Sequence, residues 1–249
     1  MDIFQPQWNY NATLRPANFG ENGISVLSSM SDRNVAYQLQ AGDYSGKTFV
    51  GGTGSDVIYV ENGAENINVN SGGGNDYVYN SANNAQISLG AGNDNIENTG
   101  NYAVTEGGEG NDQITISGEN SFIYGGAGNN RINVYGENSR VYLFEGNNTV
   151  QVGVDVTKIY VEGFGVGDEI NFGSDAITSL ETSGENLIAH VGERQVTISG
   201  VSQISKTESG GWFMKESVDD AGETVTLNSA VYSQYVDKSG ACIEDNAIR

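Results

Sequence analysis

The stretch Gly107-Gly108-Glu109-Gly110-Asn111-Asp112-Gln113-Ile114-Thr115 decides how this chain folds. Its first six residues are rich in Gly and Asn, which tolerate positive φ better than other residues, so they predict a tight turn. An apolar residue, Ile114, follows the acidic position by two places and alternates with polar neighbours, which predicts a short strand directly after the turn.

The same turn recurs along the chain at a fixed interval. The acidic position falls at residues 76, 94, 112, 130 and 148, so successive copies are equally spaced. An earlier copy at Asp56 precedes Asp76 by a slightly longer step, and its two extra residues lie near residues 61–63. Such self-similarity is typical of a solenoid, in which each repeat stacks on the next.

Two series of apolar positions accompany the turns. One follows the acidic position by two residues and comprises Ile58, Val78, Ile96, Ile114, Ile132 and Val150. The other lies nine residues earlier and comprises Phe49, Val69, Ile87, Thr105, Ile123 and Val141. A spacing of nine residues indicates two short strands and two tight turns per coil, with the two series pointing inward from opposite sheets. The sequence therefore predicts an all-β, parallel β-roll of two sheets, with 18 residues per coil, rather than a three-faced β-helix.

The turns at the second edge of this roll differ from the Gly-rich turns. They lack the Gly-x-Gly-x-Asp spacing and carry Asn at one register, which Tyr102 interrupts. These residues are Asn66, Asn84, Asn120 and Asn138. We expect them to stack as a hydrogen-bonded ladder.

The repeat resembles the nonapeptide of the RTX, or haemolysin-type, proteins, Gly-Gly-x-Gly-x-Asp-x-U-x, in which U is a large apolar residue. Residues 51–59 and 107–115 match this pattern fully, whereas 71–79 and 89–97 replace its first Gly and 125–133 carries Asn130 in place of Asp. The resemblance covers roughly residues 42–155 and implies a β-roll that binds calcium.

The resemblance also implies which residues hold the metal. In RTX proteins each ion lies between two Gly-rich turns one coil apart, which predicts Ca²⁺ on one edge only, between the successive acidic positions from 56 to 130. A fifth site at 130/148 would have no carboxylate and is not expected. The implied metal residues are Gly51, Gly52, Gly54, Asp56, Gly72, Gly74, Asp76, Gly90, Gly92, Asp94, Gly108, Gly110, Asp112, Gly126, Gly128 and Asn130. This donor set agrees with the preference of Ca²⁺ for six to eight carboxylate and carbonyl oxygens.

Calcium is also expected to control folding. Stacked Asp residues repel one another without a cation, so we expect residues 51–150 to be largely disordered without calcium and to fold when it binds. The alternative is a Gly- and Asn-rich coil held by main-chain ladders alone, with the Asp residues acting only as turn formers.

The flanks predict caps for the two open ends of the roll. Residues 1–41 are expected to form an N-terminal cap, in which a ligand-binding role for Trp8 and Tyr10 is kept as an alternative. Residues 42–155 form the roll, and residues 156–249 are expected to form a C-terminal cap of β-hairpins, with strands at 187–191 and 196–198.

Composition limits the partners. The formal net charge is −21, with 32 acidic and 11 basic residues, which disfavours nucleic acid and anionic membrane surfaces. The single cysteine, Cys242, excludes an internal disulfide. No apolar run is long enough to predict a membrane span, and residues 1–30 lack the pattern of a Sec signal, so we expect export by another route or a signal outside this sequence.

No catalytic pattern is found. The chain has one histidine, His190, and neither a His-Glu-x-x-His nor a Gly-x-Ser-x-Gly motif. We expect no catalytic residue and no enzyme activity, but a secreted or cell-surface calcium-binding module. Three alternatives stay open: a carrier module of a larger secreted enzyme, an adhesin with a cell-surface or polysaccharide partner, and an ice-binding surface.

Overall fold

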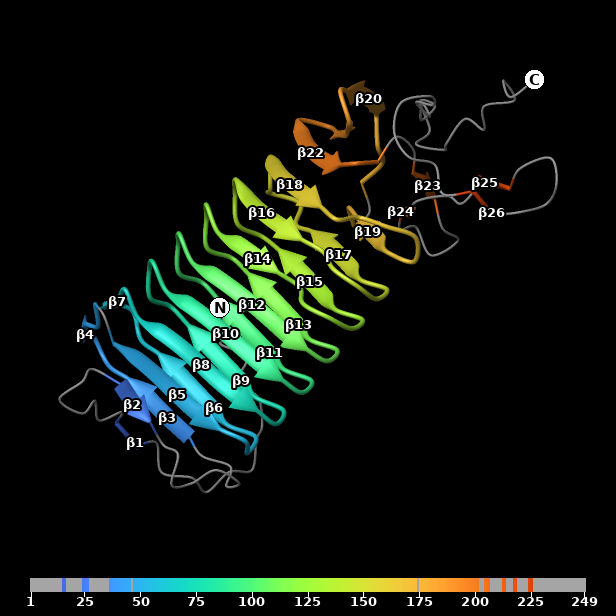
Figure 1. Ribbon diagram of the computed structural model, residues 1–249. Coiled ribbons are helices and arrows are strands. Elements are labelled where there is room, and N and C mark those ends of the chain that lie inside the picture. Colours follow the sequence, from blue (N-terminus) through green and yellow to red (C-terminus); the bar gives the residue numbers. More distant parts are fainter. Residues whose placement is uncertain are drawn as a thin grey trace.

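The computed structural model describes residues 15–16, 24–26, 36–45, 47–173, 175–201, 204–206, 212–213, 217–218 and 224–225. Every regular element in these residues is a strand. Figure 1 shows an elongated stack of parallel coils, a β-solenoid of about seven turns. The predicted all-β, two-sheet roll is confirmed.

Two sheets of 11 strands each form the two faces of the roll. Sheet A consists, in spatial order, of β1 (Arg15–Pro16), β3 (Ala36–Leu39), β6 (Val57–Val60), β9 (Tyr77–Asn80), β11 (Asn95–Asn98), β13 (Gln113–Ile116), β15 (Arg131–Val134), β17 (Thr149–Val152), β19 (Glu169–Asn171), β24 (Trp212–Phe213) and β23 (Ser205–Lys206). Sheet B consists of β2 (Ile24–Val26), β5 (Thr48–Gly52), β8 (Asn68–Gly73), β10 (Gln86–Ala91), β12 (Val104–Glu109), β14 (Phe122–Tyr124), β16 (Ser139–Tyr142), β18 (Lys158–Glu162), β22 (Arg194–Ser199), β21 (Asn186–Val191) and β20 (Ser179–Ser183).

The register between coils follows the sequence repeat. Ile96 pairs with Ile114 in sheet A, and Ile87 pairs with Thr105 in sheet B, so each residue pairs with its equivalent one repeat later. In the longer first step, Ile58 still pairs with its equivalent, Val78. The extra residues enter the turn that contains β7 (Ala64–Glu65), which pairs with β4 (Gly42–Asp43) in a small separate sheet. An insertion in a turn leaves the strand register intact, because the added residues do not enter the ladders.

The core lies between the two sheets. Every residue of the two predicted apolar series is at most 2% exposed, so their inward orientation is confirmed. On or next to several strands, a second apolar residue two places from the first is also buried, as alternation along a strand predicts. These additional buried residues include Val60, Leu89, Ile116, Val134, Leu143 and Val152. The core is therefore deeper than one apolar side chain per strand.

The second edge is linked by main-chain hydrogen bonds rather than by the expected side-chain ladder of its Asn row. Asn84 N–H donates to the carbonyl of Asn101 at 2.9 Å, and Asn120 N–H donates to that of Glu137 at 2.8 Å. All five residues of the row, Tyr102 included, have φ between 54° and 59°. Asn recurs here because it tolerates the left-handed region at low cost. A side-chain ladder does run on this edge, one residue earlier, where Asn101 N–H donates to Asn83 Oδ1 at 2.9 Å.

At the C-terminal end, parallel pairing continues beyond residue 155 through β18 and β19. The strands β20, β21 and β22 then form antiparallel hairpins that extend sheet B. β21 and β22 lie at the predicted positions 187–191 and 196–198, whereas β20 was not predicted. Buried Arg194 ties these hairpins to the last coils. Its guanidinium donates to Gly153 O at 3.0 Å, Phe172 O at 3.5 Å and Asp175 Oδ2 at 2.6 Å. A buried guanidinium satisfied in this way acts as a structural clamp.

A further pair of strands, β25 (Ser217–Val218) and β26 (Thr224–Val225), is antiparallel. Trp8, Tyr10 and Cys242, which the sequence singles out, lie outside the described residues, as does most of the expected N-terminal cap.

Candidate metal centre on the Gly-rich edge

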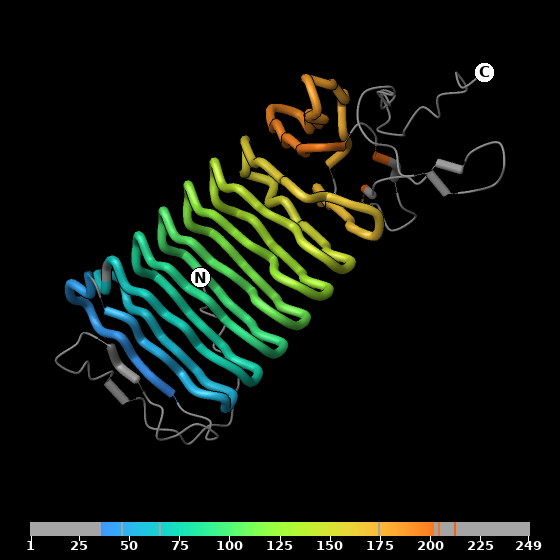
Figure 2. Tube along the Cα trace, viewed as in Figure 1, coloured from blue at the N-terminus to red at the C-terminus, as the bar shows by residue number. Residues whose placement is uncertain are grey.

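The Gly-rich turns stack directly on one another along one of the two edges at which the tube in Figure 2 bends. Gly90 and Gly92 have φ of +103° and +136°, and a Cβ added to either would lie within 2 Å of the carbonyl oxygen of Gly72 or Gly74, one coil earlier. The same holds for Gly108 and Gly110, whose nearest oxygens belong to Gly90 and Gly92. These positions therefore require Gly for conformation and for close stacking. The consequence is two columns of carbonyl groups along the edge.

The acidic position of every repeat turns its side chain into this edge rather than toward solvent. Asp56, Asp76, Asp94 and Asp112 are at most 3% exposed, and Asn130, Asn148 and Asp168 continue the row at no more than 2%. The structure thus places all the predicted carboxylates in one line.

From Asp76 onward, one oxygen of each side chain in the row, Oδ1, accepts a hydrogen bond from the main-chain N–H of the equivalent residue one coil earlier. Asp76 N–H donates to Asp94 Oδ1 at 2.7 Å, and Asp94 N–H donates to Asp112 Oδ1 at 2.8 Å. Asp112 N–H donates in turn to Asn130 Oδ1 at 2.9 Å. Each Oδ1 therefore links its own coil to the main chain of the coil before it. This bond is independent of charge, because carboxylate and amide both provide it.

The second oxygen, Oδ2, differs. In Asp76, Asp94 and Asp112 this atom is buried and accepts no hydrogen bond within the part of the chain that the structure describes, although the Ser71 hydroxyl lies near enough to Asp76 to lower its pKa. A buried carboxylate oxygen without a donor is costly, so each of these atoms requires a positive or hydrogen-bonding neighbour.

Asn130 shows what surrounds this second position. Its Oδ1 accepts from Asp112, so its other atom is the amide nitrogen, and that nitrogen donates to Gly126 O at 3.2 Å and to Gly128 O at 3.5 Å. By the register of the repeat, the corresponding groups around Oδ2 of Asp112 are the carbonyls of Gly108 and Gly110. Gly108 O also accepts from Ala127 N–H at 2.7 Å, and a carbonyl oxygen keeps a second lone pair with which it can contact a cation.

Burial and mutual repulsion raise the pKa values of the row. Burial, together with the carboxylates of Asp76 and Asp112, raises the pKa of Asp94 to about 7, although the N–H of Asp76 opposes this shift. Burial is also the main reason that the pKa of Asp76 rises to about 6. The pKa of Asp112 is raised by burial and lowered in part by the N–H of Asp94. A metal-free row therefore holds protons more tightly than ordinary carboxylates do.

An outer Asn ladder flanks the row on its exposed side. Asn93 N–H donates to Asn75 Oδ1 at 2.8 Å, and Asn111 N–H donates to Asn93 Oδ1 at 2.7 Å. Here the acceptor lies one coil before the donor, the reverse of the Asp row. The motif residue before each Asp thus has a structural task that the sequence analysis did not assign.

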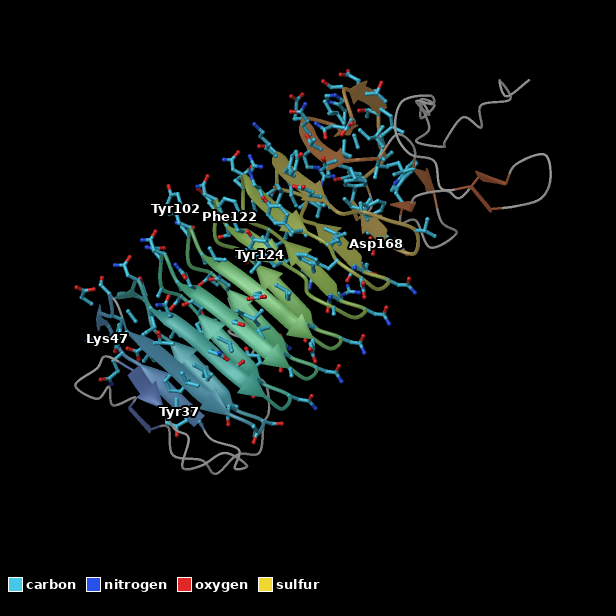
Figure 3. The ribbon with its side chains drawn as sticks, in the orientation of Figure 1. Tyr37, Lys47, Tyr102, Phe122, Tyr124 and Asp168 are labelled. Carbon is cyan, nitrogen blue, oxygen red and sulfur yellow. The ribbon has the colours of Figure 1, made fainter. Side chains whose placement is uncertain are left out.

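The sequence analysis also missed Asp168 as a member of the row. Its Oδ1 accepts from Asn148 N–H at 2.7 Å, and its Oδ2 accepts from Gly165 N–H at 2.8 Å. Figure 3 shows Asp168 at the Gly-rich edge, on the side of the roll opposite Tyr102. The signal was present, because Ile170 follows Asp168 by two places, but the step from Asn148 is longer than the regular repeat and hid it.

These residues fit a hard cation. Among the described residues, no three Asp, Glu, His or Cys side chains group around one point, so any metal on this edge depends on main-chain carbonyls. One carboxylate oxygen with nearby carbonyls is the type of donor set that suits Ca²⁺ and does not suit Zn²⁺. The structure brings the predicted Gly and Asp residues together, and Asn130 contributes an amide nitrogen to this edge.

Elsewhere, the one histidine lies beside a carboxylate of the neighbouring strand. His190 lies on β21 with its Nε2 3.5 Å from Glu181 Oε1 on the neighbouring strand β20. In the described part of the chain, no helix is long and apolar enough to cross a membrane.

Comparison with known proteins returned no relative: no family model, no curated protein and no solved structure matches this chain. The function must therefore be argued from the site itself.

Proposed function

We propose that this chain is an extracellular calcium-binding module of the RTX type, whose Gly-rich edge holds Ca²⁺ and whose role is structural rather than catalytic. The observation that carries the proposal is the set of buried Oδ2 atoms of Asp76, Asp94 and Asp112, which accept no hydrogen bond from the described residues. A cation at each of these positions supplies the missing positive charge.

Different groups of the turn would contribute different ligands to the ion. Oδ2 of each Asp provides a charged ligand, while the carbonyls of the two stacked Gly residues of the same turn provide neutral ones. Oδ1 stays with the main chain of the preceding coil and so fixes the orientation of the carboxylate. Bound Ca²⁺ supplies charge neutralisation between coils. Folding and binding are then coupled, because the site exists only when the turns are stacked.

Calcium titration by calorimetry, with circular dichroism followed in parallel, tests the proposal. We expect about four ions per chain, with dissociation constants on the order of 10⁻⁴–10⁻³ M as in other extracellular modules. Mg²⁺ at the same concentration should be a poor substitute, since it demands a tighter octahedral shell. An absence of binding heat, with an unchanged strand signal in chelator and in calcium, would refute the proposal.

Two variants make the test specific. Asp94→Asn removes one charged ligand and should reduce the stoichiometry by at least one ion. Glu109→Gln is the matched control, because it removes a charge from an exposed residue of the neighbouring Gly-rich turn, outside the buried row. Equal loss of binding in both variants would mean that the edge attracts calcium only through its overall negative charge.

Calcium-dependent folding fits a protein that works outside the cell, where the ion is plentiful, so we propose a secreted or cell-surface location. This does not distinguish a self-sufficient module from the carrier module of a larger secreted enzyme. Assay of the complete gene product for hydrolytic activity distinguishes these two.

A second candidate function, saccharide binding, is favoured by a groove of about 390 Å³ on the outer face of sheet B. Its lining includes the amides of Asn68, Asn70 and Gln86, and Tyr124, whose ring stacks on that of Tyr142 at 4.8 Å, lies at one end. Amides beside an aromatic ring match the polar rim and apolar face of a sugar. A glycan array probed in calcium tests this function, with Tyr124→Ala as the variant expected to lose binding.

A further inference from the structure

We infer that Asn130 and Asn148 hold their amide nitrogens where the preceding coils hold a cation, so that these two coils are complete without metal. The inference rests on the proposed function for the identity of the ion. It adds which coils depend on calcium and which do not.

The geometry around Asn130 carries the first step. The side chain is 2% exposed, and both of its polar atoms have partners: Oδ1 accepts from Asp112, and Nδ2 donates to the carbonyls of Gly126 and Gly128. The amide N–H group of Asn130 thus points at the carbonyls that correspond, in its own turn, to those that a cation would contact in an Asp coil. The positive end of the amide dipole replaces the positive charge of the ion.

Asn148 repeats the arrangement one coil later. Its Oδ1 accepts from Asn130 N–H at 3.0 Å, and its Nδ2 donates to Phe144 O at 3.4 Å and to Asp168 Oδ1 at 3.0 Å. Asp168 then ends the row with hydrogen bonds to both of its oxygens. From Asn130 to Asp168, no polar side-chain atom of the row is buried without a partner, in contrast to Asp94 and Asp112.

The division has a direction along the roll. The residues that need a cation lie in the N-terminal coils of the row. Asn130, Asn148 and Asp168 need no cation, and they lie next to the hairpins that Arg194 clamps. The C-terminal coils can therefore stay stacked when calcium is removed, and the first Asp coil to reform has a folded neighbour on which to stack. For a solenoid, in which each coil contacts only its neighbours, such a partner lowers the cost of adding the next coil.

Asn130→Asp tests the inference directly. In chelator this variant places a carboxylate oxygen against two carbonyls, so its melting temperature should fall by about 5–10 °C. In calcium it should bind one ion more than the wild type and recover the lost stability. Asn129→Asp is the matched control: it adds the same charge to the same turn, but on the exposed outer ladder, where its Oδ1 can still accept from Asn147 N–H.

The reciprocal variant, Asp112→Asn, guards against failure of Asn130→Asp to fold. It should raise the melting temperature in chelator and lower the ion count by at least one. Hydrogen exchange of the wild type in chelator should show β15 and β17 protected and β9 and β11 open.

The outcomes separate the inference from the proposed function. If the wild type binds no calcium while Asn130→Asp alone is destabilised, the function fails and the role of the amide stands. If the wild type binds calcium, but Asn130→Asp neither loses stability in chelator nor gains an ion, the inference is overturned and the function stands. Uniform exchange across all coils in chelator also overturns it.

Discussion

The main-chain N–H of Asp94 donates to Oδ1 of Asp112 at 2.8 Å, whereas Oδ2 of Asp112 accepts no hydrogen bond from the described residues. One carboxylate thus joins two coils through one oxygen and leaves the other to a ligand from outside the chain. The predictions about charge and metal follow from this asymmetry.

The pH dependence of the metal-free protein should run opposite to ordinary acid denaturation. The pKa of Asp94 is about 7 in the folded protein and about 3.9 in an unfolded chain, so the folded state binds the proton more tightly. Stability from this group is therefore complete below about pH 4 and is lost as the pH rises toward 7. Thermal melting in chelator between pH 4 and 8 checks this.

Asp94→Asn is the control for that measurement, since the net charge of −21 also favours unfolding as the pH rises. The variant should have a shallower decline of melting temperature than the wild type. Identical slopes would assign the whole effect to general repulsion. In saturating calcium we expect the opposite sign, because protons compete with the ion for the carboxylates.

Replacement of Gly92 by Ala should prevent correct stacking of its turn. Gly92 has φ of +136°, and a Cβ there would lie 1.6 Å from Gly74 O. We expect a loss of at least about 3 kcal/mol in unfolding free energy, with or without calcium. Gly184→Ala is the matched control, since Gly184 also has positive φ (+63°) but meets no atom within 4 Å. That variant should cost only about 1 kcal/mol, and an equal loss in both would show that stacking is unimportant.

The fold could be predicted because the same pattern of turn and apolar residues recurs in every coil. Ile96, Ile114 and Ile132 mark one sheet at identical spacing, and an error at one copy is corrected by the others. The partners of individual polar atoms could not be predicted in this way. Whether Asn130 offers oxygen or nitrogen to its own turn depends on which atom Asp112 N–H takes, and that requires the relative height of adjacent coils. Asp168 was missed for a related reason, because two extra residues in the opposite turn, between β17 and β18, lengthen the step from Asn148.

The clamp at the C-terminal end should be as important as a core residue. Arg194 is 5% exposed and donates to two main-chain carbonyls of other segments and to Asp175. Arg194→Leu leaves those groups without their donor, so we expect a loss of about 2–4 kcal/mol. Urea unfolding followed by fluorescence of the buried Trp212 measures this loss.

Arg140→Leu serves as the control for the clamp. The guanidinium of Arg140 lies over the Tyr160 ring at 5.0 Å, an exposed contact worth at most about 1 kcal/mol. Equal losses in the two variants would contradict the clamp.

Tyr102 should be the one residue of the second edge whose replacement stabilises the roll. It has φ of +57° at a register where the other four coils carry Asn, and the residue is 59% exposed, so it has strain without compensating burial. Tyr102→Asn keeps the main-chain bond to Glu119 O and should add about 1 kcal/mol to the unfolding free energy. Tyr135→Asn is the control, because Tyr135 is similarly exposed but lies outside the positive-φ row. Thermal melting of both variants in calcium decides the point. A gain for Tyr102→Asn alone assigns the Asn row to backbone conformation, whereas no gain would mean that the Asn side chains serve another purpose on that edge.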